Sequence, residues 1–541
     1  MTNYSTISHG HDSDAASGNS GDMTRQRRGR GYLKDGGGGG QASMISSIVN
    51  LLNTIIGAGT LAMPSAMSHF GMTLGIIVIV WSAFTSALGL YLQSRCARYL
   101  DRGTASFGAV AQMTYPNAAI IFEGAIAVKC FGVAVSYLII IGDLMPGVVE
   151  GFDSRATEIP YLMNRNFWIT IFMLVIMPLA FLRRLDSLKY TSIVALLAIG
   201  YLIVLVVYHF ASDTLAPRDK VRYVEWGGPV EALSALPVIV FAYTCHQNKF
   251  SILNELKDNS PARQVSRFNA HFIIGSAAAV YVLVAITGYM TFGNDVDGNI
   301  VSMYPPSTAS TIAKAAIVIL VTFSIPLQVH PCRASIYAVT QWRPRGSSRS
   351  STAPGSPGSR SLLPTSQARK NSDHGSGAEI SDIVFAALTS LILILAYITA
   401  LTVSSLERVL AFVGSVGSTS ISFILPGVFY WKISHPDSGH QQRLAKEDDD
   451  ATAHGAEDSD DGGDDEGLLG ASTGSIRSAA SGASGRGRNV KSPWRWRAKW
   501  RWDMEHLTEV FLRQAAGFLA VYGVCVLVVC LTLNMVGSIK H

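Results

Sequence analysis

Two long apolar stretches of this sequence are interrupted by residues that break helices or carry polar side chains. The stretch at 44–66 contains Gly57 and Gly59, and the stretch at 232–252 contains a polar run at 244–248. Glycine weakens a helix by about 1 kcal/mol relative to alanine. An interrupted helix leaves peptide groups free, and free N–H groups at a helix start attract a carboxylate. These residue types therefore suit the binding of a small zwitterion.

The glycines of the first stretch allow two interpretations. They could form a close-packing face, because small residues let two membrane helices approach each other. They could also mark an unwound point, since Pro64 follows on the next turn and removes a backbone donor. A broken helix is tolerated in a membrane only where it lines protein or a water-filled cavity, and transporters place such breaks at their substrate sites. We favour the second interpretation, because the polar run at 244–248 would also be costly without a cavity or partner groups.

The composition places both stretches in a membrane. The chain has 541 residues, of which 48% are hydrophobic and 15% are charged, against about 25% charged residues in an ordinary soluble domain. A helix needs roughly 20 consecutive apolar residues to cross a bilayer. Eleven segments approach that length, at 44–66, 71–94, 118–146, 167–182, 190–211, 232–252, 268–292, 309–330, 381–403, 408–431 and 508–536. The sequence therefore predicts an all-α membrane protein with eleven transmembrane helices.

The charges of the connectors predict the orientation of the chain, because Lys and Arg favour the cytoplasmic side. Basic residues collect after the second, fourth, sixth and eighth segments, whereas the connector at 293–307 has none. We therefore expect a cytosolic N-terminus and a C-terminus on the far side. The expected parts are a disordered tail at 1–43, eight helices at 44–342, a Ser/Pro/Arg-rich cytosolic loop at 343–379, two helices at 380–432, an acidic and then Trp/Arg-rich cytosolic loop at 433–506, and the last helix with a short C-terminus at 507–541.

The cysteines and the segments outside the membrane narrow the expected ligands and location. The six cysteines include no CxxC pair, so we expect neither a metal site nor a disulfide framework. In the second loop, the run from Asp464 to Leu469 fits an acidic dileucine pattern, which routes membrane proteins to vacuoles or lysosomes. The Trp/Arg stretch at 494–502 suits the headgroup layer. We therefore expect the lipid bilayer and not nucleic acid as its partner, and cytosolic partners stay open.

Three motifs resemble the amino acid/auxin permease family. They are Gly-Ala-Gly-Thr-Leu-Ala-Met-Pro at 57–64, Ser-Tyr-Leu-Ile-Ile-Ile-Gly-Asp-Leu-Met-Pro at 136–146 and Phe-Ala-Tyr-Thr-Cys-His-Gln-Asn at 241–248. Within that family they resemble fungal vacuolar amino-acid transporters and the related sodium-coupled neutral amino-acid transporters. The resemblance is strong over 44–340 and weak over 381–536. It implies the leucine-transporter-like fold, with two inverted repeats of five helices plus one extra helix.

The resemblance also implies roles for residues near both interruptions. Backbone groups of the first stretch would bind the carboxylate and amine of an amino acid, and the second stretch would close the other side of the pocket. These substrate-binding candidates are Ile56, Gly57, Ala58, Gly59, Thr60, Phe241, Ala242, Tyr243 and Thr244. In the sodium-coupled relatives, an Asn on the first span and a Thr on the eighth mark a cation site. Asn53 matches the Asn, and Thr322, with Ser324 close by, matches the Thr.

Coupling to protons requires a titratable group inside the membrane. His246 is our candidate, because an imidazole titrates near neutral pH. The alternative is a histidine that is only hydrogen-bonded within the packed interior. The fungal relatives that the chain resembles are thought to couple to protons, whereas the match at Asn53 allows Na⁺. We predict H⁺ as the coupling ion, with Na⁺ as the alternative.

Together these features predict a proton-coupled secondary transporter that moves amino acids across the vacuolar membrane by alternating access. Two alternatives are a receptor that binds an amino acid and signals through its cytosolic tail, and a Na⁺-coupled importer of the plasma membrane. An enzyme is not expected, since the sequence has no HExxH motif and no paired carboxylates within its apolar segments. We therefore assign no catalytic residue and no cofactor.

Overall fold

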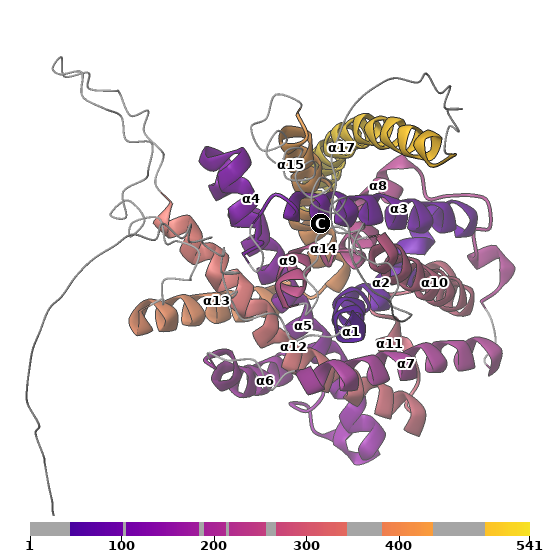
Figure 1. Cartoon of the computed structure of the whole chain (residues 1–541). Coiled ribbons are helices and arrows are strands. Elements are labelled where there is room, and N and C mark those ends of the chain that lie inside the picture. The colour runs from indigo at the N-terminus through magenta and orange to yellow at the C-terminus, as the bar shows by residue number, and fades with distance from the viewer. Residues whose placement is uncertain are drawn as a thin grey trace, which may run out of the picture. The chain divides into compact units, whose positions relative to one another are not determined.

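The computed structural model describes residues 44–100, 104–182, 189–212, 216–255, 267–342, 381–435 and 493–540. Among these residues every regular element is a helix (Figure 1). The helices are α1 (Met44–Ile55), α2 (Ala58–Phe70), α3 (Met72–Ala97), α4 (Phe107–Thr114), α5 (Ala119–Phe152), α6 (Arg165–Ala180), α7 (Lys189–Ser212), α8 (Pro229–Ala242), α9 (His246–Glu255), α10 (Arg267–Phe292), α11 (Ile300–Met303), α12 (Thr308–Gln341), α13 (Asp382–Thr402), α14 (Leu406–Val413), α15 (Leu425–Ile433) and α17 (Pro493–Lys540). The predicted tail at 1–43, the loop at 343–379 and most of the loop at 433–506 lie outside the described residues.

Nine helical segments of the described chain are long and apolar enough to cross a membrane. They coincide with nine of the eleven apolar segments predicted from the sequence. The first predicted segment instead forms two short helices, α1 and α2, and the fourth forms α6, an apolar helix of 16 residues. The all-α membrane architecture is therefore confirmed. The count of eleven transmembrane helices, the two inverted repeats and the orientation stay predictions.

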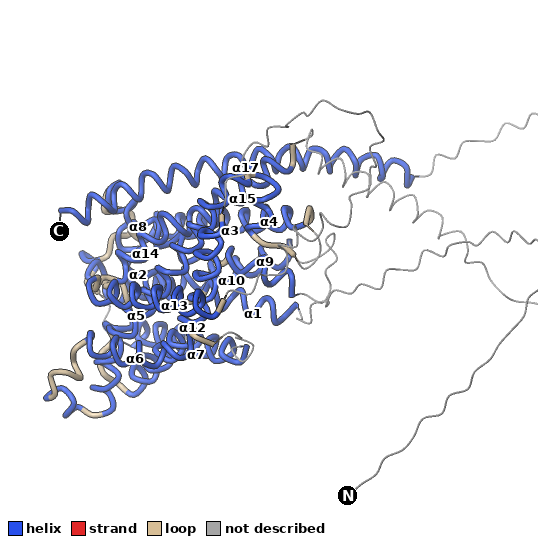
Figure 2. The backbone as a smooth tube through the Cα atoms, turned by 90° about the vertical axis from the view of Figure 1, so that its left-hand side faces the viewer, coloured by secondary structure: helices blue, strands red, loops and turns tan. Residues whose placement is uncertain are grey.

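The interior of the described helices is built around α5 and α12. Each is 34 residues long, and the two pack along each other. In an apolar stretch of 18 residues within the span Pro116–Phe152, which contains α5, 78% of residues are buried. In the corresponding stretch of the span Glu509–Gly537, which belongs to α17, only 28% are buried. Figure 2 shows α17 as one continuous helix, and it packs against α15 and α8. This helix begins at Pro493, so its backbone includes the Trp/Arg stretch that the sequence placed in a loop.

Between α14 and α15 the backbone forms two π-helical turns, η7 (Gly414–Ser418) and η8 (Ser420–Ile424). Such turns are rare and are frequently found at functional sites. Glycine allows η7 to come very close to its neighbours. A Cβ on Gly414 would overlap the carbonyl group of Pro237 in α8, and a Cβ on Gly417 would lie 2.7 Å from Lys129 Cβ in α5. The π-helical segment is thus packed directly against α5 and α8.

Candidate functional site

The first and sixth predicted spans are both broken. α1 ends at Ile55 and α2 begins at Ala58, with Gly57 between them outside helical dihedral angles (φ −146°, ψ −133°). α8 ends at Ala242 and α9 begins at His246. Each break falls where the sequence showed its interruption. The glycines and the polar run therefore mark real breaks in the helices.

The two breaks meet at a glycine. Gly59 in α2 lies against Ala242 at the end of α8, and a Cβ on Gly59 would lie 2.5 Å from Ala242 Cβ and 2.7 Å from Ala242 Cα. Side chains essentially never approach backbone that closely, so glycine is what lets the helices touch at this point. The contact brings the predicted residues at 56–60 and 241–244 together. All of them are buried except Gly57, which is half-buried.

A tyrosine from α10 joins the two breaks. The hydroxyl of Tyr281 lies 2.7 Å from the carbonyl oxygen of Ile55 and 2.8 Å from that of Ala242, and Tyr281 is fully buried. These carbonyls belong to the last residues of α1 and α8, where a helix leaves its carbonyls without partners within the helix. A tyrosine hydroxyl carries one proton, so it can serve only one of them fully. The two breaks therefore offer more acceptor capacity than Tyr281 can fill.

Donors and aromatic side chains surround the same place. α2 begins without a side-chain cap, and the first N–H groups of a helix have no partners within it. Tyr243 follows α8, is fully buried, and its hydroxyl has no hydrogen-bond partner among the described residues. Its ring lies edge-on to Tyr281, with the ring centroids 5.0 Å apart. Buried polar groups are normally paired, so this combination of free groups suits a small zwitterion.

His246 is fully buried at the start of α9 and contacts two other elements. Its Nε2 lies 3.2 Å from the carbonyl oxygen of Ser86 in α3, and because a carbonyl only accepts, Nε2 carries a proton. Its Nδ1 lies 3.1 Å from Ser422 Oγ in η8. Ser422 Oγ is in turn 3.2 Å from Thr244 Oγ1, which donates its own proton to the carbonyl of Val240 at 2.9 Å. The Ser86 carbonyl, His246, Ser422 and Thr244 form a hydrogen-bond chain that ends in the second break.

This hydrogen-bond chain lacks one proton when His246 is neutral. Ser422 then donates to Nδ1, and while Thr244 donates to Val240 no proton remains for the contact between Ser422 and Thr244. When His246 is protonated, Nδ1 donates to Ser422, and Ser422 can donate to Thr244. A proton on His246 would therefore complete the chain. A neutral histidine that holds α3, α9 and η8 together fits the same distances, so the coupling role stays a prediction.

The predicted cation ligands are spread over two helices. Thr322 is buried and donates to the carbonyl of Val318 at 2.6 Å, and Ser324 is half-buried and donates to that of Leu320 at 2.8 Å. Being two residues apart on a helix, they point about 200° apart, so they do not face one site together. Asn53 is half-buried on α1, which packs against α7, α9 and α10. The cation site stays a prediction, and Thr322 fits it better than Ser324 because it is buried.

Two buried residues near the breaks were not among the predicted site residues. One feature of the sequence could have indicated a role for Tyr281, because a tyrosine within an apolar segment needs a hydrogen-bond partner for its hydroxyl. Lys129 in α5 is 3% exposed, and its Nζ lies 6.0 Å from the ring centroid of Phe241. A buried lysine is costly, and only the fold reveals that this one lies beside the second break. Its charge would favour a carboxylate nearby.

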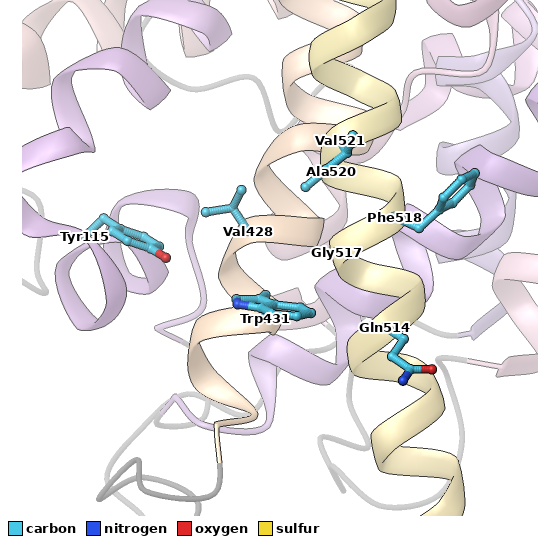
Figure 3. Close-up of a pocket in the computed structure, with 8 residues that line it drawn as sticks. All are labelled: Tyr115, Val428, Trp431, Gln514, Gly517, Phe518, Ala520 and Val521. Carbon is cyan, nitrogen blue, oxygen red and sulfur yellow. The ribbon is translucent and has the colours of Figure 1, made fainter.

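A separate groove lies between α15 and α17 (Figure 3). Its volume is about 500 Å³, and it contains none of the predicted site residues. It is open and mostly apolar, and Trp431, Phe518 and Val521 in its walls are exposed. An apolar, open wall does not suit a zwitterion, because charged groups are costly to bury without partners. We expect lipid acyl chains to fill this groove.

Known proteins resemble this chain over most of its length. "Vacuolar amino acid transporter 5" of Schizosaccharomyces pombe is 45% identical over 398 residues, which cover 73% of this chain and 86% of that protein. "Vacuolar amino acid transporter 6" of Saccharomyces cerevisiae is 39% identical over 416 residues, which cover 72% of this chain and 90% of that protein. "Sodium-coupled neutral amino acid symporter 2" of Danio rerio is 24% identical over 433 residues, which cover 74% of this chain and 77% of that protein. None of these three relatives is named as an enzyme.

The family model described as "Transmembrane amino acid transporter protein" matches residues 40–449, which include both breaks, Tyr281 and the π-helical turns. With this match and the fungal relatives, the chain belongs to the transmembrane amino acid transporter family.

Proposed function

We propose that the protein is a secondary active transporter that moves amino acids across the vacuolar membrane by alternating access. The observation that carries the proposal is the meeting of two broken helices, where α1 and α8 offer carbonyl groups and α2 offers N–H groups. The names of the fungal relatives support amino acids as the substrates and the vacuole as the location. Such a constellation of peptide groups can bind both ends of an amino acid while leaving its side chain free to vary.

In the proposed complex, the substrate ammonium takes the carbonyls of Ile55 and Ala242. An ammonium group has three protons and a full charge, so it satisfies two carbonyls better than the single proton of Tyr281 does. The substrate carboxylate lies at the start of α2, where free N–H groups and the positive end of the helix dipole favour an anion. Lys129, whose Nζ lies 6.0 Å from the Phe241 ring centroid, adds positive charge beside the second break.

Coupling to protons is part of the proposal, and His246 is the group assigned to it. Thr244 belongs to the second break and also ends the hydrogen-bond chain from His246. Protonation would therefore change the hydrogen bonding of a group at the substrate site, which lets both ligands bias one conformational equilibrium. Na⁺ bound at Asn53 and Thr322 is the alternative, which the resemblance to a sodium-coupled symporter supports.

Uptake by purified full-length protein in liposomes tests the proposal. A labelled amino-acid mixture is supplied with a pH gradient, with a Na⁺ gradient, or with unlabelled substrate inside and no gradient. We expect exchange without a gradient, and accumulation that requires the pH gradient and is abolished by a protonophore. Accumulation driven by a Na⁺ gradient alone would show that the coupling ion is Na⁺ and not H⁺. Substrate binding, seen as thermal stabilisation, without exchange or accumulation would refute transport and favour the receptor.

A further inference from the structure

A cluster of charged side chains joins three helices away from the two breaks. His69 near the end of α2 has Nε2 at 3.0 Å from Glu407 Oε1 in α14 and Nδ1 at 3.9 Å from Glu231 Oε2 in α8. Ser65 Oγ donates to the other oxygen of Glu407 at 3.1 Å. Arg222, in the connector before α8, lies 3.5 Å from Glu231 Oε2. The cluster thus links α2, α8 and α14 through both nitrogens of one imidazole.

Both ring nitrogens of His69 face carboxylates, which fits the protonated form. A neutral imidazole has one N–H donor, whereas an imidazolium has two. His69 lies beyond the apolar stretch at 44–66, and the hydrogen bond to Glu407 raises its pKa. The charges of Glu407 and Glu231 also raise this pKa, whereas burial and the charge of Arg222 lower it. Arg408, the residue after Glu407, is a further cation whose charge acts on the Glu407 carboxylate. The ion pairs are therefore present below the pKa of His69 and are lost as the pH rises through it.

The cluster is partly exposed at the protein surface, which a site that exchanges protons requires. The side chains of His69, Glu407 and Glu231 are 31%, 29% and 51% exposed. The connector charges of the sequence predict that this end of the helices lies on the side opposite the cytosol. In Figure 2, α2, α8 and α14 lie together toward the end at which α17 finishes. The pH that acts on His69 would therefore be that of the far compartment.

The three joined helices are those that lead to the candidate substrate site. α2 runs from the first break to His69, which is about 18 Å along a helix, and α8 runs from Glu231 to the second break at Ala242. α14 leads from Glu407 into the π-helical turns beside Lys129. A bond between the far ends of these helices would therefore resist their separation above the site. Separation at this end would open the site to the far side.

We propose that His69, held between Glu407 and Glu231, is a proton-binding site through which the far-side pH controls the entrance to the substrate site. Protonated His69 joins α2 to α8 and α14 and keeps the entrance closed. Deprotonated His69 loses the ion pairs, and the entrance opens more readily. This inference rests on the proposed transport function, and it assigns to His69 a role separate from that of His246.

Exchange of labelled amino acid at equal pH on both sides of the liposome membrane tests the inference. The wild-type exchange rate should rise with pH, with a midpoint above the ordinary pKa of a histidine, because deprotonation of His69 releases the entrance. His69→Gln keeps a side chain that can hydrogen-bond but cannot titrate, so its exchange rate should not show this midpoint. Glu407→Gln should lower the midpoint by about one pH unit or more, because a carboxylate within 4–6 Å shifts a neighbouring group by that much.

Lys220→Gln is the matched control, because it removes an exposed ion pair with Asp295 (2.6 Å) at the same end of the helices without removing a histidine. Its exchange rate should keep the wild-type midpoint.

Melting temperature in detergent gives a second readout, in which the stability advantage of wild type over His69→Gln should shrink as the pH rises. If His69→Gln cannot be folded, the midpoint of Glu407→Gln decides alone. If wild type exchanges substrate and the midpoint is unchanged in both variants, or in the one that folds, the inference is wrong. If wild type does not exchange substrate at all, the proposed function is wrong instead.

Discussion

One added methyl group can test the contact between the two breaks. In Gly59→Ala the new methyl would lie 2.5 Å from Ala242 Cβ and 2.7 Å from Ala242 Cα, which is about 1 Å closer than an ordinary carbon–carbon contact. Because one of these atoms belongs to the backbone, no side-chain rotation relieves the overlap. Either α2 or α8 must move by about 1 Å, which shifts the two breaks relative to each other, and a shift of α8 also moves the Ala242 carbonyl away from Tyr281.

The energy of this change follows from two opposing effects. Overpacking of a tight interior costs about 1–3 kcal/mol, whereas alanine is favoured over glycine in a helix by up to about 1 kcal/mol. We therefore expect Gly59→Ala to be destabilised by up to about 2 kcal/mol and to lose most of its transport. Gly275→Ala in α10 is the matched control, since a Cβ on Gly275 meets nothing within 4 Å. It should be as stable as wild type or slightly more stable.

Two measurements decide this prediction. The melting temperature in detergent should fall by a few degrees for Gly59→Ala but not for Gly275→Ala, as expected for a loss of this size. Exchange of labelled amino acid in liposomes should fall steeply only for Gly59→Ala. If both variants keep the stability and transport of wild type, the close contact at Gly59 is not needed to hold the two breaks together, and the reasoning is wrong.

Three further substitutions test the roles assigned to single side chains. Tyr281→Phe removes the hydroxyl that competes with the substrate ammonium for the two carbonyls, so half-maximal exchange should need about two- to tenfold less substrate, the value of one hydrogen bond; an unchanged concentration would contradict this exchange of partners. His246→Gln should keep exchange but lose accumulation driven by a pH gradient, and intact accumulation would make His246 a packing residue. Asn53→Ala should abolish any dependence of uptake on the coupling cation, measured as uptake against Na⁺ concentration, and unchanged dependence would refute the cation site.

The location of the helices could be predicted because lipid imposes a simple length rule. All eleven apolar segments of the sequence coincide with a helix or a pair of helices in the structure. Both breaks were visible as well, because glycine at 57 and 59 and the polar run at 244–248 stand out against apolar neighbours. The fourth segment is the shortest, and α6 is correspondingly too short to count among the membrane-crossing helices by length alone.

The long-range contacts could not be predicted from one sequence. Tyr281 bonds a carbonyl 226 positions away, and His69 bonds a carboxylate 338 positions away. Spacing along the chain carries no information about such pairs, because it reports only neighbours on one helix. The π-helical turns at 414–424 were missed for another reason, since their glycines and serines are equally common in ordinary close-packed membrane helices.

The energetics of the breaks argue that they serve binding and not packing alone. A continuous helix satisfies its own peptide groups, whereas each unpaired peptide group in a membrane costs several kcal/mol. Here the ends of α1 and α8 share the single proton of Tyr281, and Tyr243 adds a buried hydroxyl without a partner among the described residues. Close packing at Gly59 would be available to two unbroken helices at no such cost. This open hydrogen-bonding capacity supports the proposal of a ligand that brings its own donors and acceptors, as an amino acid does.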